Sequence, residues 1–138
     1  MSKRNRLRRD ILEDLEAQGK TADLVLLAWS IVEMHLDNAV HRVYGVSGQD
    51  PKSDKLHRLR VAEKLKVLNR MRLLPDKEYA VLQRFKTERD TIFHRGGLFL
   101  PNYSEEQKRE LADLAIAAAD VGHDLIDKML RLPTPIGK

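Results

Sequence analysis

The sequence contains no cysteine and no long apolar run, and both absences narrow the class of protein. Without cysteine the chain cannot form a disulfide framework or a thiolate metal site, which suits a reducing compartment. The longest apolar run, at residues 24–32, lies between Asp23 and Glu33 and is far shorter than the roughly 20 residues that span a bilayer. The basic N-terminal residues lack the apolar stretch of a signal peptide. We therefore expect a soluble, cytoplasmic protein.

No internal repeat or Pro/Gly-rich linker divides the chain, and its 138 residues fit one domain. We expect a basic N-terminal segment with an accessory helix at residues 1–20, a helical bundle at 21–131 and a flexible tail at 132–138. The sequence also lacks a Gly-rich phosphate loop and an HExxH pair of metal ligands. His35 and His41 point about 120° apart on a helix, so they do not form a metal pair. We expect no cofactor and no metal.

Apolar residues recur with helical spacing through most of the chain, and strand-like alternation is absent. Glycines and capping residues divide the chain into five predicted helices, at residues 6–18, 21–44, 53–73, 76–94 and 104–131. The second of these is apolar over more than half its circumference, which indicates burial on two sides and favours a two-fold homodimer. Four long helices with short links predict an all-α fold, an up-and-down four-helix bundle with an additional N-terminal helix.

Positive charge is concentrated in the middle of the sequence. Residues 52–95 hold 13 basic and 6 acidic side chains, a surplus of seven, whereas the segments on either side are slightly acidic. A concentrated basic face is typical of a polyanion-binding protein, because Lys and Arg replace the counterions of phosphates. The alternative is a solvated face that only aids solubility. In the helix at 53–73 the pattern places one set of residues inward, namely Leu56, Leu59, Ala62, Leu65, Leu68 and Met71, and another set largely outward, namely Arg58, Arg60, Lys64, Lys66, Arg70 and Arg72.

The last turns of the helix at 76–94 hold an arginine in an unusual place. At 100° per residue, Arg89 lies in the middle of the apolar stripe that contains Leu82. A guanidinium is costly to bury without an anion or a cluster of acceptors. Arg89 therefore either pairs with a carboxylate, such as Glu33 or Asp37, or lines a cleft.

Asp90 and His94 lie four residues apart on one helix face, beside Arg89. The carboxylate can accept a hydrogen bond from the imidazole and fix its tautomer. A histidine next to Gly96 and Gly97 at the end of a helix has solvent access and can transfer protons. The alternative is a histidine that only caps the helix, where its positive form suits the helix dipole.

Residues 89–94, with the sequence RDTIFH, resemble the signature of the HEPN superfamily (higher eukaryotes and prokaryotes nucleotide-binding), an arginine and a histidine separated by four to six residues. The resemblance implies a HEPN-like bundle and a metal-independent endoribonuclease, whose active cleft forms where two copies of the motif meet in a homodimer. It implies Arg89 and His94 as catalytic residues and Asp90 as their supporting polar residue. The tyrosine that follows the histidine in some toxin members is absent, since Arg95 stands there.

RNA cleavage without a metal needs a proton-transfer group and a cation at the phosphorane, and His94 and Arg89 fit these roles. We expect Glu33 to orient Arg89 from the helix at 21–44. A toxin, defence or RNA-processing role would add a cognate antitoxin or regulatory protein as a partner, with no membrane involved. RNA contacts are expected from Arg60, Lys64, Lys66, Lys86 and Arg95.

The alternative function is a non-catalytic helical regulator that binds nucleic acid or protein through its basic helices. An inactive HEPN domain and a mannitol-repressor-like regulator are both of this class. Catalysis needs Arg89 and His94 to be reachable by solvent and to converge on one cleft, whereas a binding module could bury them apart.

Overall fold

The computed structural model describes residues 2–94, 100 and 102–131, with the backbone alone at 93 and 94, and this part of the chain is helical without strands. The prediction of an all-α fold is confirmed. The tail at 132–138 and the glycines predicted to end the fourth helix, Gly96 and Gly97, lie outside the described residues. The described helices are α1 (Lys3–Ala17), α2 (Thr21–Val43), α3 (Ser53–His57), α4 (Val61–Arg70), α5 (Asp76–His94) and α6 (Glu105–Arg131).

The helix ends follow the capping residues closely. Gly19 and Gly45 adopt positive φ angles of 71° and 66° after α1 and α2, where a residue with a side chain would be strained. The Ser104 side chain accepts a hydrogen bond from the Gln107 backbone N–H at 3.0 Å, and the Gln107 side chain accepts one from the Ser104 N–H at 2.8 Å. This reciprocal capping box starts α6 where the sequence predicts it.

The predicted third helix is wrong as a single element, because the structure divides it into α3 and α4. Arg60 has extended backbone angles, φ −68° and ψ 153°, and its N–H donates to the Glu63 side chain at 3.4 Å as α4 begins. The burial of two residues in this segment also differs from the prediction. Met71 is 55% exposed instead of buried, and Lys64 is buried instead of exposed.

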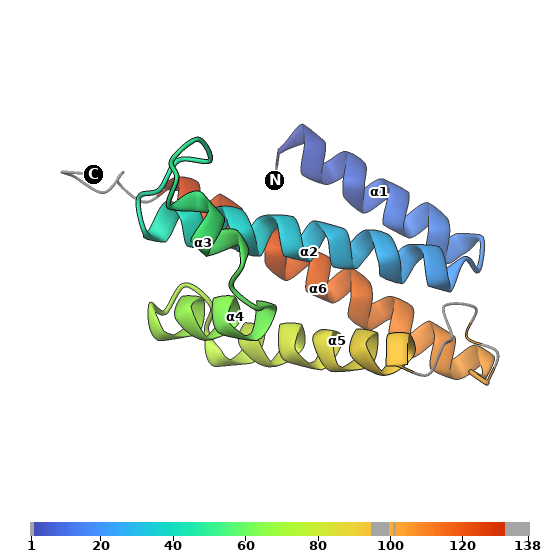
Figure 1. The fold of residues 1–138 in the computed structure, drawn as a ribbon. Helices are drawn as coiled ribbons and strands as arrows, with labels where there is room; N and C mark the ends of the chain where they lie inside the picture. The colour runs from blue at the N-terminus through green and yellow to red at the C-terminus, as the bar shows by residue number, and fades with distance from the viewer. Residues whose placement is uncertain (1, 95–99, 101, 132–138) are drawn as a thin grey trace.

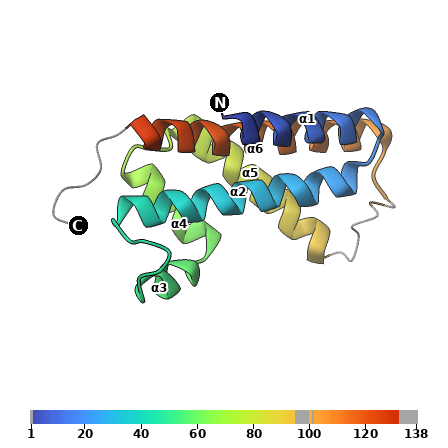
Figure 2. The ribbon, with the colours of Figure 1, turned by 90° about the horizontal axis from the view of Figure 1, so that it is seen from above.

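The order of helix directions also differs from an up-and-down bundle. Figures 1 and 2 show α2, α4 and α6 running in one direction, with α1 and α5 running in the other. The segment that contains α3 brings the chain back along α2, so that α4 then runs parallel to α2. The parallel pairing of α2 and α6 is visible at their C-terminal ends, where Arg42 Nε donates to the Met129 carbonyl at 3.1 Å.

α2 lies at the centre of the core and packs against α1, α3, α4 and α6. The side of α6 that is buried is rich in small residues, which allows two helices to approach closely. At Gly122 even a methyl group would lie only 3.2 Å from Cδ2 of His35. The buried small residues of α6 are Ala112, Ala115, Ala118, Ala119 and Gly122.

α1 is packed into the same core, beyond the accessory role that the sequence indicates. Leu12 is fully buried. Arg9 Nη1 lies 2.7 Å from both carboxylate oxygens of Asp120 on α6. On the outer side of α1, Leu7 and Ile11 are 60% and 41% exposed.

The apolar surface of α2 is used within the monomer. Its large apolar residues are buried or half-buried except Leu26, which is 39% exposed. The apolar surface from which the sequence predicts a homodimer is therefore largely covered within one chain, and the homodimer stays a prediction. No helix in the described part of the chain combines the length and apolar character needed to cross a membrane.

Two histidines form a buried pair between α2 and α6. His35 Nε2 lies 2.8 Å from His123 Nδ1, and the rings meet edge-on with centroids 4.9 Å apart. Burial, together with the positive charge that His123 and Arg8 can present, lowers the pKa of His35 to about 4. Burial also lowers the pKa of His123. At neutral pH both rings are therefore uncharged, with one donating to the other.

We predict that acid weakens the fold through this pair. The pKa of His35 is lower in the folded chain than in the unfolded chain, so its stabilising effect is complete above the ordinary value of 6.5 and is lost as the pH falls toward about 4. Once His35 is fully protonated, the free energy of unfolding is lower by about 3 kcal/mol, because each unit of difference in pKa corresponds to about 1.36 kcal/mol. Urea unfolding followed by circular dichroism from about pH 7 to about pH 4.5 measures it.

The double variant His35→Gln/His123→Gln should show a flatter pH dependence, because neither position can then take up a proton. A wild-type protein with the same free energy of unfolding at both ends of this range would contradict the prediction.

Candidate functional site

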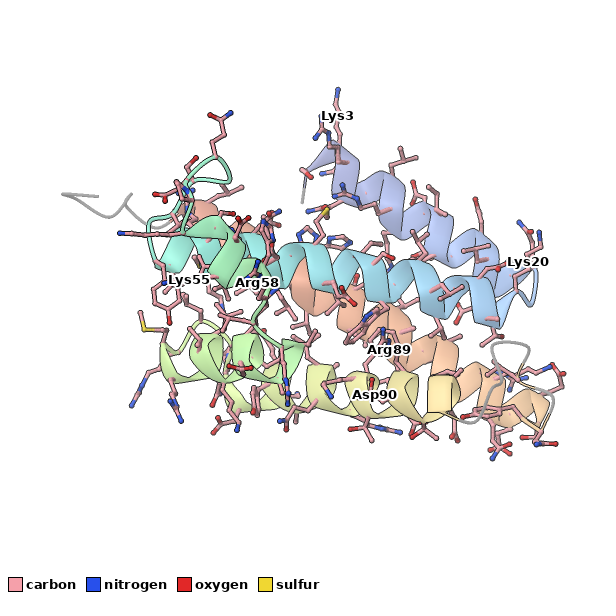
Figure 3. The ribbon with its side chains drawn as sticks, in the orientation of Figure 1. Lys3, Lys20, Lys55, Arg58, Arg89 and Asp90 are labelled. Atoms are coloured by element: carbon pink, nitrogen blue, oxygen red, sulfur yellow. The ribbon has the colours of Figure 1, made fainter. Side chains whose placement is uncertain are left out.

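The guanidinium of Arg89 is held against an aromatic ring. Its central carbon lies 4.7 Å from the centroid of the Trp29 ring on α2, a cation–π contact between α5 and α2. Phe85, one turn before Arg89, meets the same ring edge-on at 5.7 Å. In Figure 3 the side chain of Arg89 reaches from α5 toward α2. Arg89 is therefore positioned by the core, although 30% of its side chain remains exposed.

Asp90 lies between two cations of its own helix. Arg89 Nη1 donates to Oδ1 at 3.0 Å, and Lys86 Nζ donates to Oδ2 at 2.8 Å. Burial raises the pKa of the Asp90 carboxyl, but the hydrogen bonds and charges of Lys86 and Arg89 outweigh it and hold the pKa below its ordinary value. Asp90 is therefore ionised at neutral pH, with both oxygens engaged.

The carboxylates expected to pair with Arg89 from α2 do not do so. Glu33 is exposed, and the ion pair of Arg89 among the described residues is with Asp90. Asp37 binds Lys64 at 3.0 Å. The geometry gives no support to Glu33 as the residue that orients Arg89; Trp29 and Asp90 hold it instead.

His94 is the last residue of α5, so the helix continues through the whole motif from Arg89. Its side chain and all of Arg95 lie outside the described residues. The expected contact of Asp90 with His94 stays a prediction. The carboxylate oxygens that would make it also bind Lys86 and Arg89.

The residues expected to bind RNA are in three different environments. Arg60 and Lys66 are exposed near α4, as the sequence predicts. Lys86 is half-buried in its ion pair with Asp90. Lys64 is only 8% exposed and binds Asp37, which corrects its placement on the outer face. The cause is the packing of α4 against α2, where the Lys64 side chain reaches the carboxylate of Asp37.

Trp29 is the residue of this site that sequence reasoning missed. The main apolar stripe of α2 contains Leu24, Ala28 and Val32, and Trp29 lies to one side of it. That offset was the available signal, because a second buried side of α2 needs a second neighbouring helix. The neighbour is α5, which brings Arg89 to the ring. The sequence pattern could indicate the burial of Trp29 but not its partner.

Comparison of the chain with models of protein families, with curated proteins and with solved structures finds no match.

We predict that Arg89 shields the only tryptophan of the chain from solvent. In Arg89→Met, which removes the charge, and in Arg89→Lys, which removes the planar group, acrylamide should quench Trp29 fluorescence more strongly than in wild type. Arg84→Met changes an exposed arginine of the same helix and is the matched control. Equal quenching in all four proteins would show that the guanidinium does not cover the ring.

Proposed function

We propose that this protein is a metal-independent endoribonuclease that cleaves RNA in the cytoplasm as a symmetric homodimer. The observation that supports it best is the state of Arg89, which is held by Trp29 and Asp90 while 30% of its side chain remains exposed. A guanidinium fixed in place can grip two phosphate oxygens without a large loss of side-chain entropy on binding. His94 ends the same helix, five residues further along.

In this proposal the 2′-oxygen of RNA attacks the adjacent phosphorus. The new P–O2′ bond forms as the P–O5′ bond breaks, which leaves a 2′,3′-cyclic phosphate and a free 5′-hydroxyl. His94 takes the proton of the 2′-hydroxyl or supplies one to the leaving oxygen, and Arg89 stabilises the charge on the phosphorane. The same pair on the second copy supplies the other proton transfer, which is why the proposal includes a dimer.

The proposal rests on the local geometry of Arg89 and on the HEPN resemblance of residues 89–94. By that resemblance it includes a HEPN-like bundle, and it extends to a toxin, defence or processing role with an antitoxin or regulator as partner.

The nuclease proposal is tested by paired substitutions in α5. His94→Ala should reduce cleavage by about two to four orders of magnitude, the usual contribution of a positioned acid or base. Arg89→Lys keeps the charge but loses the planar fork, so we expect a comparable fall with the helix content unchanged. Asp90→Asn should have a smaller effect. Gel assays on single-stranded and structured RNA measure the rates.

Arg84→Lys is the matched control, because Arg84 is an exposed arginine of the same helix. Cleavage by wild type should persist in excess chelator and should yield cyclic phosphate ends. The proposal fails if His94→Ala cuts as fast as wild type, or if no tested RNA is cut although RNA is bound.

The second candidate function is an RNA-holding module without catalysis. It is favoured by a set of exposed cations in and around α3 and α4, which we call the basic surface. Among the described residues none of them takes part in an ion pair. The basic surface consists of Lys52, Lys55, Arg58, Arg60, Lys66, Arg70 and Arg72.

RNA binding by the basic surface should weaken steeply with salt, because phosphate contacts release counterions. The double variant Arg60→Ser/Lys66→Ser should lower the slope of log K against log salt by roughly two. Lys3→Ser/Lys20→Ser removes the same charge at α1 and at the start of α2 and should leave the slope unchanged; Figure 3 shows both lysines away from α3. Fluorescence anisotropy with labelled RNA measures both. If log K of wild type does not change with log salt, the basic surface does not have this role.

A further inference from the structure

Three side chains with metal-ligating atoms converge where α3 lies against α2. Asp37 and His41 come from successive turns of α2, and His57 ends α3. His57 Nδ1 lies 2.8 Å from Asp37 Oδ2, and His41 Nδ1 lies 3.6 Å from Asp37 Oδ1. One donor atom from each of the three residues lies within 4.8 Å of the other two. The two imidazole rings are tilted toward one another with centroids 4.7 Å apart.

The spacing of these atoms suits a transition-metal ion. Two ligands of a tetrahedral zinc ion, each about 2.1 Å from the metal, are about 3.4 Å apart. The separation of His57 Nδ1 from Asp37 Oδ2, 2.8 Å, is shorter than that value, while His41 Nδ1 lies 3.6 Å from the other carboxylate oxygen, Oδ1. The 4.8 Å limit on the whole group is longer than that value, so small shifts of the side chains would bring the three donors to this spacing. Two imidazoles and one carboxylate are a ligand set that Zn²⁺ and similar divalent ions accept. His57 is 54% exposed, so the site opens to solvent and leaves room for a water ligand.

His41 is already oriented by a second partner. Its Nε2 lies 2.7 Å from the hydroxyl oxygen of Ser53, and its Nδ1 lies 2.8 Å from the Asp37 carbonyl oxygen. The carbonyl oxygen can only accept, so Nδ1 carries the ring proton when no metal is bound. If Nδ1 binds a metal, this hydrogen bond is broken and the ring proton moves to Nε2, where it can be donated to Ser53. An outer partner of this kind fixes the ring and is typical of metal-binding histidines. Ser53 is only 2% exposed, which makes it a support for the ring and keeps it out of reach of a substrate.

Lys64 opposes metal binding from the other side of the carboxylate. Its Nζ lies 3.0 Å from Asp37 Oδ1, and only 10% of its side chain is exposed. The ammonium therefore neutralises part of the charge that would attract a dication. Asp37 Oδ2, on the side of His57, is the oxygen that can bind an ion while Lys64 stays in place.

We propose that Asp37, His41 and His57 bind one divalent transition-metal ion of the Zn²⁺ class, which fastens α3 to α2. The bound ion adds positive charge near two residues of the basic surface that Figure 3 labels, Lys55 of α3 and Arg58, which follows α3 directly. The site lies eight residues along α2 from Trp29, about 12 Å at 1.5 Å per residue, so the ion takes no part in chemistry at Arg89. Neither proposal depends on the other.

The test uses the full chain freed of any affinity tag, titrated with ZnCl₂ by calorimetry and with CoCl₂ by visible absorption. We expect one equivalent of Zn²⁺ per chain, a rise in melting temperature and a Co²⁺ spectrum of low-symmetry coordination. His57→Ala changes an exposed ligand and should weaken binding by at least about tenfold, since even outer partners of a metal site contribute that much. Lys64→Met should strengthen binding, because the competing ammonium is gone.

Asp54→Asn is the matched control, because it removes an exposed carboxylate from the same short helix without touching the three ligands. It should bind Zn²⁺ as wild type does. Equal Zn²⁺ affinity in wild type and His57→Ala, or no bound Zn²⁺ in either wild type or Lys64→Met, overturns the proposal. RNA cleavage in chelator is measured separately, so a failure of the metal site and a failure of the nuclease are distinguishable.

Discussion

The structure depends on the burial of α2, which carries polar side chains as well as apolar ones on its covered sides. Such groups are costly in the core unless they are paired. Trp29 meets Arg89 of α5, His35 meets His123 of α6, and Asp37 meets Lys64 of α4. These contacts use different neighbours, so together they determine how α4, α5 and α6 sit along the central helix. The apolar residues of α2 supply the burial, and its polar residues set the arrangement.

The local signals of the sequence predicted most helix ends but not the break between α3 and α4. The apolar period continues through residues 56–68, and no glycine or proline stands at 58–60. Contacts with α2 lie on both sides of the break, since Asp37 binds His57 before it and Lys64 after it. A periodic pattern shows which residues can share a face, but it does not show that the backbone between them stays helical. The reversal of direction that makes α2 and α4 parallel follows from this segment and was equally hidden.

The sequence predicted that Arg89 needs a partner at the candidate site, but it did not predict which residues are its partners. The position of Arg89 on an apolar stripe required an anion or acceptors, and the structure supplies Asp90 from the next residue and the face of Trp29. Carboxylates of α2 were the expected partners because they approach from the facing helix. Asp37 is held by Lys64 instead. Whether two complementary charges meet depends on the rotation of each helix about its axis, which depends on packing across the whole core.

The two carboxylate clusters differ in the balance of their charges, and this difference separates their chemistry. At Asp90 one carboxylate lies between two cations, Lys86 and Arg89, whose side chains are partly exposed. Cations of this kind are typical ligands of phosphate groups. At Asp37 the permanent cation among its described neighbours is Lys64, which is almost fully buried, and the other two described partners are imidazoles. A neutral imidazole offers a lone pair and no charge, so this second cluster is suited to a metal cation and the first to an anion.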